Sequence, residues 1–290
     1  MAEAAQEHPA RPWLLLSPAL VSITFLLLIP ALFVFVYSFW LRTATGADVP
    51  ELNLGNWREI FGDEFYRLIL WQTMRIAAIT TVVCALMGYV PAYFLAHTRI
   101  EQKAYLLLLL MLPFWISYII RTLSWINILG VSGAINVFLE WTTLIDEPFQ
   151  MLYNEASVVL GLVHYLLPFM ILNVYVSLDG IDKNLEPAAR TLGCTPWQAF
   201  LEVTLPLSLP GLAAGSLLCF VLGAGTYITP LVLGGPGDAM FANLIFEAII
   251  IQLDWPLGSA LSIVLLVLLG SVVLLYNRFM GLSQVYKSFG

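Results

Sequence analysis

Charged side chains are scarce in this sequence. Only 11% of its 290 residues are Asp, Glu, Lys or Arg, whereas 60% are hydrophobic. A soluble domain carries about a quarter charged residues, so this composition, with a mean hydropathy of +0.87, excludes an ordinary soluble domain and indicates a protein of the lipid bilayer. The net charge is −7, and no Lys/Arg cluster is present of the kind that nucleic-acid binding requires.

The sequence also lacks the motifs of common enzymes. Its three histidines do not form HExxH, its three cysteines share no CxxC spacing, and it contains no GxxxxGK[ST] phosphate-binding loop. Ser216 with His164 is the nearest approach to a serine-protease pair, and it has no supporting residues. Cys84 and Cys219 fall in apolar runs and are expected to be core residues. We therefore expect no catalysis and no cofactor in this chain. A passive channel is disfavoured too, because nothing resembles a filter sequence.

Long apolar runs dominate what remains. A helix needs about 20 apolar residues to cross the hydrocarbon core, and continuous rather than alternating runs favour helices over a barrel. The first run is too long for a signal-peptide core and is expected to be retained. The sequence predicts an all-α membrane protein with one domain, 1–290, and six spans at about 13–40, 68–96, 104–129, 156–178, 209–233 and 257–279.

The distribution of Lys and Arg predicts the orientation of these spans. Cytoplasmic segments are enriched in these residues. With the N-terminus inside, seven lie on the cytoplasmic side: Arg11, Arg99, Lys103, Lys183, Arg190, Arg278 and Lys287. Three lie outside: Arg42, Arg58 and Arg67. Both termini are therefore expected in the cytoplasm. Most acidic residues fall on the outer side, where they would attract a cationic solute or a basic protein surface.

The polar segment NLEPAARTLGCTPWQAFLEVTLPLSLPG, residues 184–211, runs from an expected cytoplasmic loop at 179–208 into the start of the fifth span. Asn184 can cap a first short helix, and Gly193 can end it in a left-handed conformation. Thr195, followed by Pro196 and Gln198, predicts a second helix with a capping box. That helix is expected to end near Leu205-Pro206, before Pro210-Gly211 opens the fifth span.

This helix pair has two interpretations. It is either a connecting loop that packs onto its own helix bundle or a protruding helix pair that binds a cytoplasmic partner. Ala188-Ala189-x-x-x-Gly193, followed by Leu205-Pro206 and Pro210-Gly211, resembles the "EAA" loop of ABC-importer permeases of the MetI-like family. Three further stretches resemble the spermidine/putrescine branch of that family: Leu112-Pro113-Phe114-Trp115, Leu167-Pro168-Phe169 and Asp254-Trp255-Pro256-Leu257-Gly258.

The resemblance implies a function, partners and residues. Coupling helices of the family seat on an ATPase, which implies coupling roles for Glu186, Ala188, Ala189, Gly193, Thr195 and Phe200. Pro187 stands where the family has its glutamate, and Glu186 precedes it, rotated by about 100° on a helix. The implied setting is a bacterial inner membrane. The implied partners are a second, PotC-like permease, two copies of a PotA-like ATPase that holds ATP and Mg, and a periplasmic PotD-like binding protein.

The implied solute is a polyamine, with opines, compatible solutes and phosphonates as alternatives. Carboxylates and aromatic faces suit ammonium groups, which makes the following residues candidates for the solute pathway: Trp115, Tyr118, Asn173, Tyr227, Glu247 and Asp254. Carboxylates deep in the spans are few. His164 is expected to be a packed hydrogen-bonding residue. Arg121 either faces a water-filled cavity or pairs with a carbonyl or an acid near the outer surface, and a structural role is expected for it.

Overall fold

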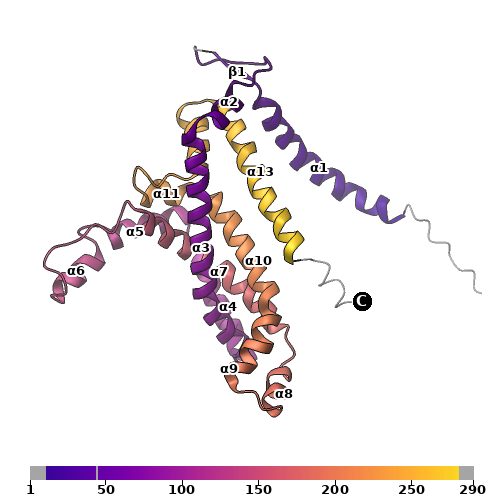
Figure 1. Cartoon of the computed structure of the whole chain (residues 1–290), viewed down its shortest axis with the longest axis vertical. Coiled ribbons are helices and arrows are strands. Elements are labelled where there is room, and N and C mark those ends of the chain that lie inside the picture. Colours follow the sequence, from indigo (N-terminus) through magenta and orange to yellow (C-terminus); the bar gives the residue numbers. More distant parts are fainter. Residues whose placement is uncertain (1–10, 44, 281–290) are drawn as a thin grey trace, which may run out of the picture.

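The computed structural model describes residues 11–43 and 45–280, and most of them are helical (Figure 1). Residues 1–10 and 281–290, and therefore Lys287 and both termini, lie outside the described residues. Within the described part, six helical segments are long and apolar enough to cross a bilayer: Leu16–Tyr37, Glu64–His97, Tyr118–Trp141, Glu155–Asp179, Pro196–Ala224 and Trp255–Arg278. The predicted all-helical membrane fold with six spans is confirmed.

One end of the molecule carries a small hairpin. Helix α1 (Arg11–Tyr37) is followed by strands β1 (Leu41–Arg42) and β2 (Asp48–Val49), which pair antiparallel, and by α2 (Gly55–Gly62). Arg42 donates from Nη2 to the Gln252 carbonyl over 2.9 Å and lies 3.7 Å from the Asp254 carboxylate. The hairpin is thereby held to the segment that precedes the last helix, α13 (Trp255–Met280).

Helix α3 (Glu64–His97) is the longest helix of the described chain. Its 34 residues make it about 50 Å long, which exceeds the roughly 30 Å of a bilayer core. The Asp63 side chain caps it by accepting from Phe65 N. Because of this length, α3 contributes to the two largest hydrophobic clusters of the described chain and joins its two ends.

The first cluster lies near the hairpin. It joins α2, the beginning of α3, α12 (Phe241–Phe246), the π-turn η3 (Glu247–Ile251) and α13, and its buried members include Ile60, Tyr66, Phe241, Leu244 and Leu261. The second cluster joins the rest of α3 to α7 (Glu155–Asp179) and α10 (Leu205–Ala224), around Cys84, Leu166, Met170, Val174 and Cys219. Cys84 and Cys219 are fully buried, as predicted. Helices α3, α7 and α10 are therefore packed side by side.

The third expected span, 104–129, is not one helix. It consists of α4 (Ile100–Met111), a 3₁₀ turn η1 (Leu112–Trp115) and α5 (Tyr118–Leu129). Pro113 has no N–H to continue the α-helix, and Ile116 is extended, with ψ 132°. A short helix, α6 (Ala134–Trp141), follows α5. In Figure 1, α5 and α6 project from the bundle on the side opposite α13.

The break expected at Leu205-Pro206 does not occur. Helix α9 (Pro196–Ala199) runs through a π-turn η2 (Phe200–Thr204) into α10. Pro206 cannot donate to the carbonyl of Glu202, and the chain passes this point by bonding Leu205 N to the Phe200 carbonyl, five residues back. The fifth expected span, 209–233, is interrupted near its end: α10 ends at Ala224, and α11 (Ile228–Leu233) follows after a short break.

Candidate functional site

The polar helix pair forms the end of the molecule opposite the hairpin (Figure 1). Helix α8 (Leu185–Thr191) ends at a turn in which Gly193 has φ +101°, and Cys194 N bonds the Ala189 carbonyl over 3.2 Å. This is the predicted left-handed stop. Thr195 and Gln198 form the predicted capping box at the start of α9. A rigid, locally determined corner therefore joins α8 to α9.

The predicted cap at Asn184 is wrong. Its backbone is already helical, with ψ −17°, and its side chain makes no cap hydrogen bond. A capping residue needs an extended backbone to aim its side-chain oxygen at the first N–H groups. Here Asn184 Nδ2 instead donates to Asp182 Oδ1 over 3.0 Å.

The outer surface of the pair is apolar at its tip. Leu192 is 87% exposed and Trp197 is 67% exposed, and Ala188 and Gly193 are also exposed. Large apolar side chains at a prominent turn are typical of a surface that another protein covers. Sequence reasoning singled out the alanines and the glycine but missed Leu192 and Trp197. The sequence feature that could have identified them is the presence of apolar residues on both sides of a glycine turn in a polar loop.

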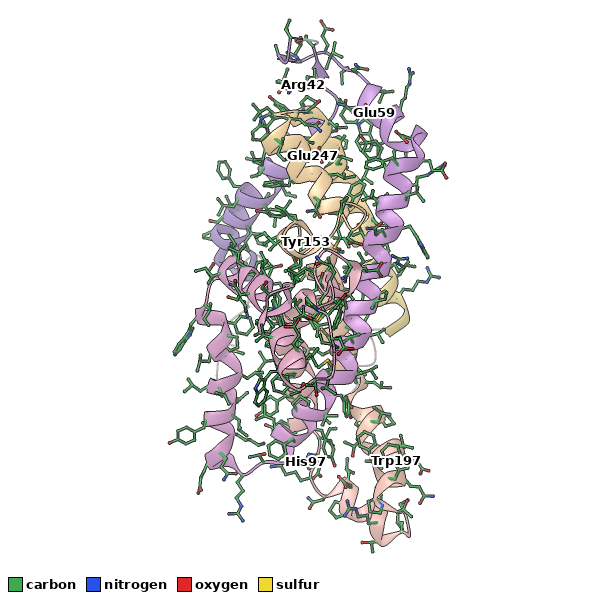
Figure 2. All side chains as sticks on the ribbon, turned by 90° about the vertical axis from the view of Figure 1, so that its left-hand side faces the viewer. Arg42, Glu59, His97, Tyr153, Trp197 and Glu247 are labelled. Carbon is green, nitrogen blue, oxygen red and sulfur yellow. The ribbon has the colours of Figure 1, made fainter. Side chains whose placement is uncertain are left out.

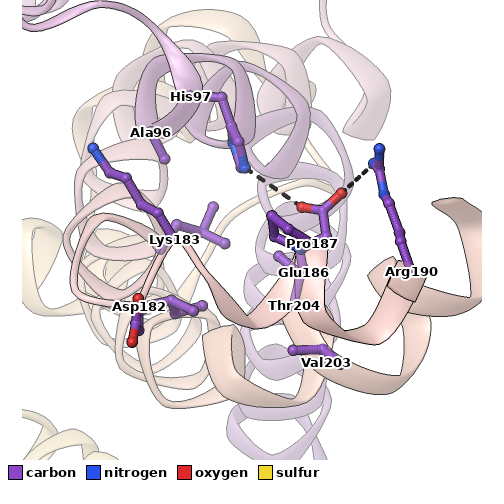
Figure 3. A pocket seen from close by; sticks show the side chains of 11 residues that line it. Ala96, His97, Asp182, Lys183, Glu186, Pro187, Arg190, Val203 and Thr204 are labelled. Carbon is purple, nitrogen blue, oxygen red and sulfur yellow. Dashed lines mark hydrogen bonds and ion pairs between the residues drawn. The ribbon is translucent and has the colours of Figure 1, made fainter. Parts of the chain in front are cut away.

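Glu186 faces into the molecule. Its carboxylate lies between two basic side chains, with Oε1 against Arg190 and Oε2 3.9 Å from His97 Nε2 (Figure 3). His97 is the last residue of α3, so this contact joins α8 to that helix. The three side chains line a cavity of about 270 Å³ together with Lys183 and Asp182. The shift of the acid by one position, caused by Pro187, thus gives it partners within this chain.

Phe200 also points inward. Its ring lies edge-on to Tyr89 and Tyr93 of α3, with centroid distances of 5.8 and 5.7 Å, and stacks on Trp197 at 5.4 Å. The Tyr89 hydroxyl is 2.8 Å from that of Ser208, at the start of α10. These contacts pack the base of α9 and α10 against α3. Phe200 is therefore placed to hold the pair in position rather than to meet a partner.

The six candidate pathway residues do not form one site. In the middle of the molecule, the Tyr118 hydroxyl bonds that of Thr229, and its ring lies 4.4 Å from that of Tyr165. Tyr227 stacks on Phe246 at 4.7 Å. These aromatic rings come from α5, α7, α12 and the break between α10 and α11.

The other candidates lie elsewhere. Glu247 is near the hairpin end, far from His97 and Trp197 (Figure 2), and Asp254 pairs with Arg42 and caps α13 through Leu257 N. Asn173 lines a separate groove of about 360 Å³ between α7 and α10. Trp115 is 78% exposed. The two carboxylates therefore lie toward the hairpin end of the molecule.

His164 and Arg121 lie on facing helices. His164 Nδ1 accepts from Trp125 Nε1 over 3.1 Å, the packing role predicted for it. Arg121 is only 8% exposed, and the carbonyl or acid expected to pair with it is absent: among the described residues, its guanidinium makes neither a hydrogen bond nor an ion pair.

The chain matches known proteins over most of its length. Residues 103–284 match the family described as "Binding-protein-dependent transport system inner membrane component". The spermidine/putrescine transport system permease protein PotB of Haemophilus influenzae is 35% identical over 254 residues, which are 88% of each chain. PotB of Escherichia coli is 34% identical over 250 residues, covering 86% of this chain and 90% of its own.

Solved structures agree on the fold. A chain of a bacterial alginate ABC transporter superposes with a TM-score of 0.74 over 96% of this chain and 98% of its own, at 18% identity. A chain of the MetNI methionine ABC transporter gives 0.51 over 74% and 96%, also at 18% identity. Sequence and fold together place this chain in the family of binding-protein-dependent transport system inner membrane components, the non-catalytic permease subunits of ABC importers.

Proposed function

We propose that this permease subunit serves the import of a polyamine such as spermidine or putrescine. Permeases of this family work with an ATPase and a periplasmic binding protein. The observation that carries the proposal is the similarity to PotB over 88% of both chains. Aromatic rings around the α10–α11 break and carboxylates at the outer end, Glu247 and Asp254, suit a chain of ammonium groups.

The exposed tip of the helix pair is proposed as the seat for the ATPase. Ala188, Leu192, Gly193 and Trp197 form its outer surface. We propose that two ATPase copies bind two permeases, this one and a related, PotC-like subunit, with a PotD-like protein delivering the solute. Two sets of contacts connect the tip to the spans and could transmit its movement. One runs along the chain through η2 into α10. The other, the α3 route, runs through the contacts of Glu186 and Phe200 with α3.

The proposed cycle is alternating access. Closure of the ATPase dimer on ATP displaces α8 and α9, and the packed contacts transmit this displacement to α3 and α10 as rigid bodies. The pathway between the permeases then opens outward, receives the solute, and reverts after hydrolysis. ATP and Mg are held by the ATPase.

Replacing His97 with alanine is expected to lower the number of solute molecules taken up per ATP by about threefold. The half-exposed pair with Glu186 contributes at most about 1 kcal/mol, or roughly fivefold in an equilibrium. ATP hydrolysis itself should persist, because the tip is unchanged. Uptake and phosphate release measured on the same proteoliposomes give the ratio.

The control is Thr98→Ala. Thr98 is the next residue, and its hydroxyl bonds only the Phe94 carbonyl one turn back. An unchanged ratio in His97→Ala, or an equal fall in Thr98→Ala, would rule out the Glu186–His97 contact as part of the α3 route.

The decisive experiment is uptake of labelled spermidine and putrescine by the reconstituted permease pair, ATPase and binding protein. An ATPase variant without its catalytic activity is the control. ATP-dependent uptake supports both the coupling and the solute. ATPase activity that only another loaded binding protein stimulates would keep the importer and reject the polyamine.

A further inference from the structure

Arg121 has the least satisfied buried polar side chain among the described residues. Its Nε and Nη1 are fully enclosed and have no hydrogen-bond partner. The third nitrogen, Nη2, is not enclosed in this way, and it too lacks a partner within the described chain. A guanidinium is always charged, and an unpaired charge away from water is strongly unfavourable. An acceptor is therefore missing.

The neighbours of Arg121 do not supply that acceptor. The guanidinium carbon lies 5.8 Å from the centre of the Tyr165 ring, and a cation–π contact of this kind is weak beside the cost of burying a charge. His164 already accepts the Trp125 N–H through Nδ1, and a neutral imidazole has a single acceptor nitrogen. The Tyr118 hydroxyl is bonded to Thr229, and within the described chain no hydrogen bond joins it to Arg121.

The position of α5 shows where the acceptor comes from. Arg121 is on the face of α5 that packs against α7 and α11, while Ile119, Ile120 and Leu123 on the other side are exposed. In Figure 1, α5 lies at the edge of the bundle. Lipid tails could cover these residues but could not accept a hydrogen bond from the open Nη2. The open Nη2 therefore needs a polar group from outside the described chain.

We propose that Arg121 binds a carboxylate of the second permease subunit and forms an ion pair between the two subunits beside the solute path. The inference rests on the proposed function, because a cationic solute cannot itself neutralise an arginine. Carboxylates match the guanidinium in charge and geometry. With the pair formed, a polyamine no longer meets a bare positive charge, and its ammonium groups compete with Arg121 for the same carboxylate.

The test uses the whole transporter with Arg121→Gln, Arg121→Lys and a control, Arg75→Gln. Arg75 is half-exposed and already pairs with Glu155 within this chain. Each Asp and Glu in the spans of the second permease is separately changed to its amide. Thermal stability of the assembled complex and spermidine uptake are measured for every variant, singly and in combination with Arg121→Gln.

The expected result is a loss of uptake of about tenfold or more in Arg121→Gln, a smaller loss in Arg121→Lys, and little change in Arg75→Gln. One amide variant of the second permease should reproduce the loss, and combining it with Arg121→Gln should add nothing further. Arg121→Glu combined with arginine at that position should restore at least a third of the uptake.

Three outcomes would overturn the proposal. The first is normal uptake and complex stability in Arg121→Gln. The second is a loss of uptake in Arg121→Gln that adds to the loss caused by every amide variant of the second permease. The third is an uptake defect confined to a carboxylate-bearing amine such as ornithine, which would mean that the solute supplies the anion. Complex stability needs no solute. A coupled stability loss without any polyamine uptake would therefore reject the polyamine and keep the ion pair.

Discussion

Replacing Gly193 with valine is expected to reduce ATP-driven uptake by at least about tenfold without lowering the amount of inserted complex. Gly193 has φ +101°, where a β-branched residue costs about 2 kcal/mol, and each 1.4 kcal/mol is about a factor of ten. No atom lies within 4 Å of a Cβ built at this position, so the effect comes from the backbone alone. The altered turn would move α8 away from the position in which it is proposed to contact the ATPase.

Gly237→Val is the matched control. Gly237 is also a loop glycine with nothing within 4 Å of an added Cβ, but its φ is not positive. Uptake in proteoliposomes and the yield of intact complex are measured for both variants. Normal uptake by Gly193→Val would mean that the geometry of this corner does not matter for coupling.

Replacing Gly211 with alanine is expected to destabilise the folded subunit by about 3 kcal/mol, an overpacking cost at the upper end of the usual range. An added Cβ would lie 2.3 Å from Ser177 Cβ and 2.6 Å from the Asn173 carbonyl oxygen. The second contact is with backbone, so no side-chain rotation relieves it. Helices α7 and α10 would have to separate. Thermal unfolding of the complex in detergent and uptake should both show the loss.

Gly270→Ala gives the opposite expectation. Gly270 is also within a helix, and nothing lies within 4 Å of its added Cβ. Alanine is the better helix former by about 1 kcal/mol, so this variant should unfold at the same temperature as the parent or a higher one. If both variants unfolded at one temperature, the close approach of α7 and α10 would carry no energetic weight.

Sequence reasoning succeeded where structure is local. The left-handed turn at Gly193 and the Thr195–Gln198 capping box depend on a few neighbouring residues, and both are present. Proline was harder to interpret. Pro113 breaks the third span, whereas Pro206 is absorbed in a continuous helix by a π-turn. The residue is the same in both cases, and the packing around it differs.

Partners far apart in the chain could not be predicted. Glu186 meets His97, and Phe200 meets Tyr89 and Tyr93, only because α3 returns to the helix pair. The polar residues chosen for the pathway were selected by type, and the fold distributes them over several sites. Arg121 was expected to pair, and its missing partner became visible only once the surrounding helices were placed.

The exposed tip formed by Leu192 and Trp197 also bears on how the protein must be produced. If the ATPase covers this tip, as proposed, a copy made without it presents these side chains to the cytosol, where chaperones and proteases recognise exposed apolar segments. Surplus subunits should therefore be short-lived, and their half-life should lengthen when the ATPase is co-expressed. Balanced synthesis of the two proteins is thus a requirement that this surface imposes on the cell.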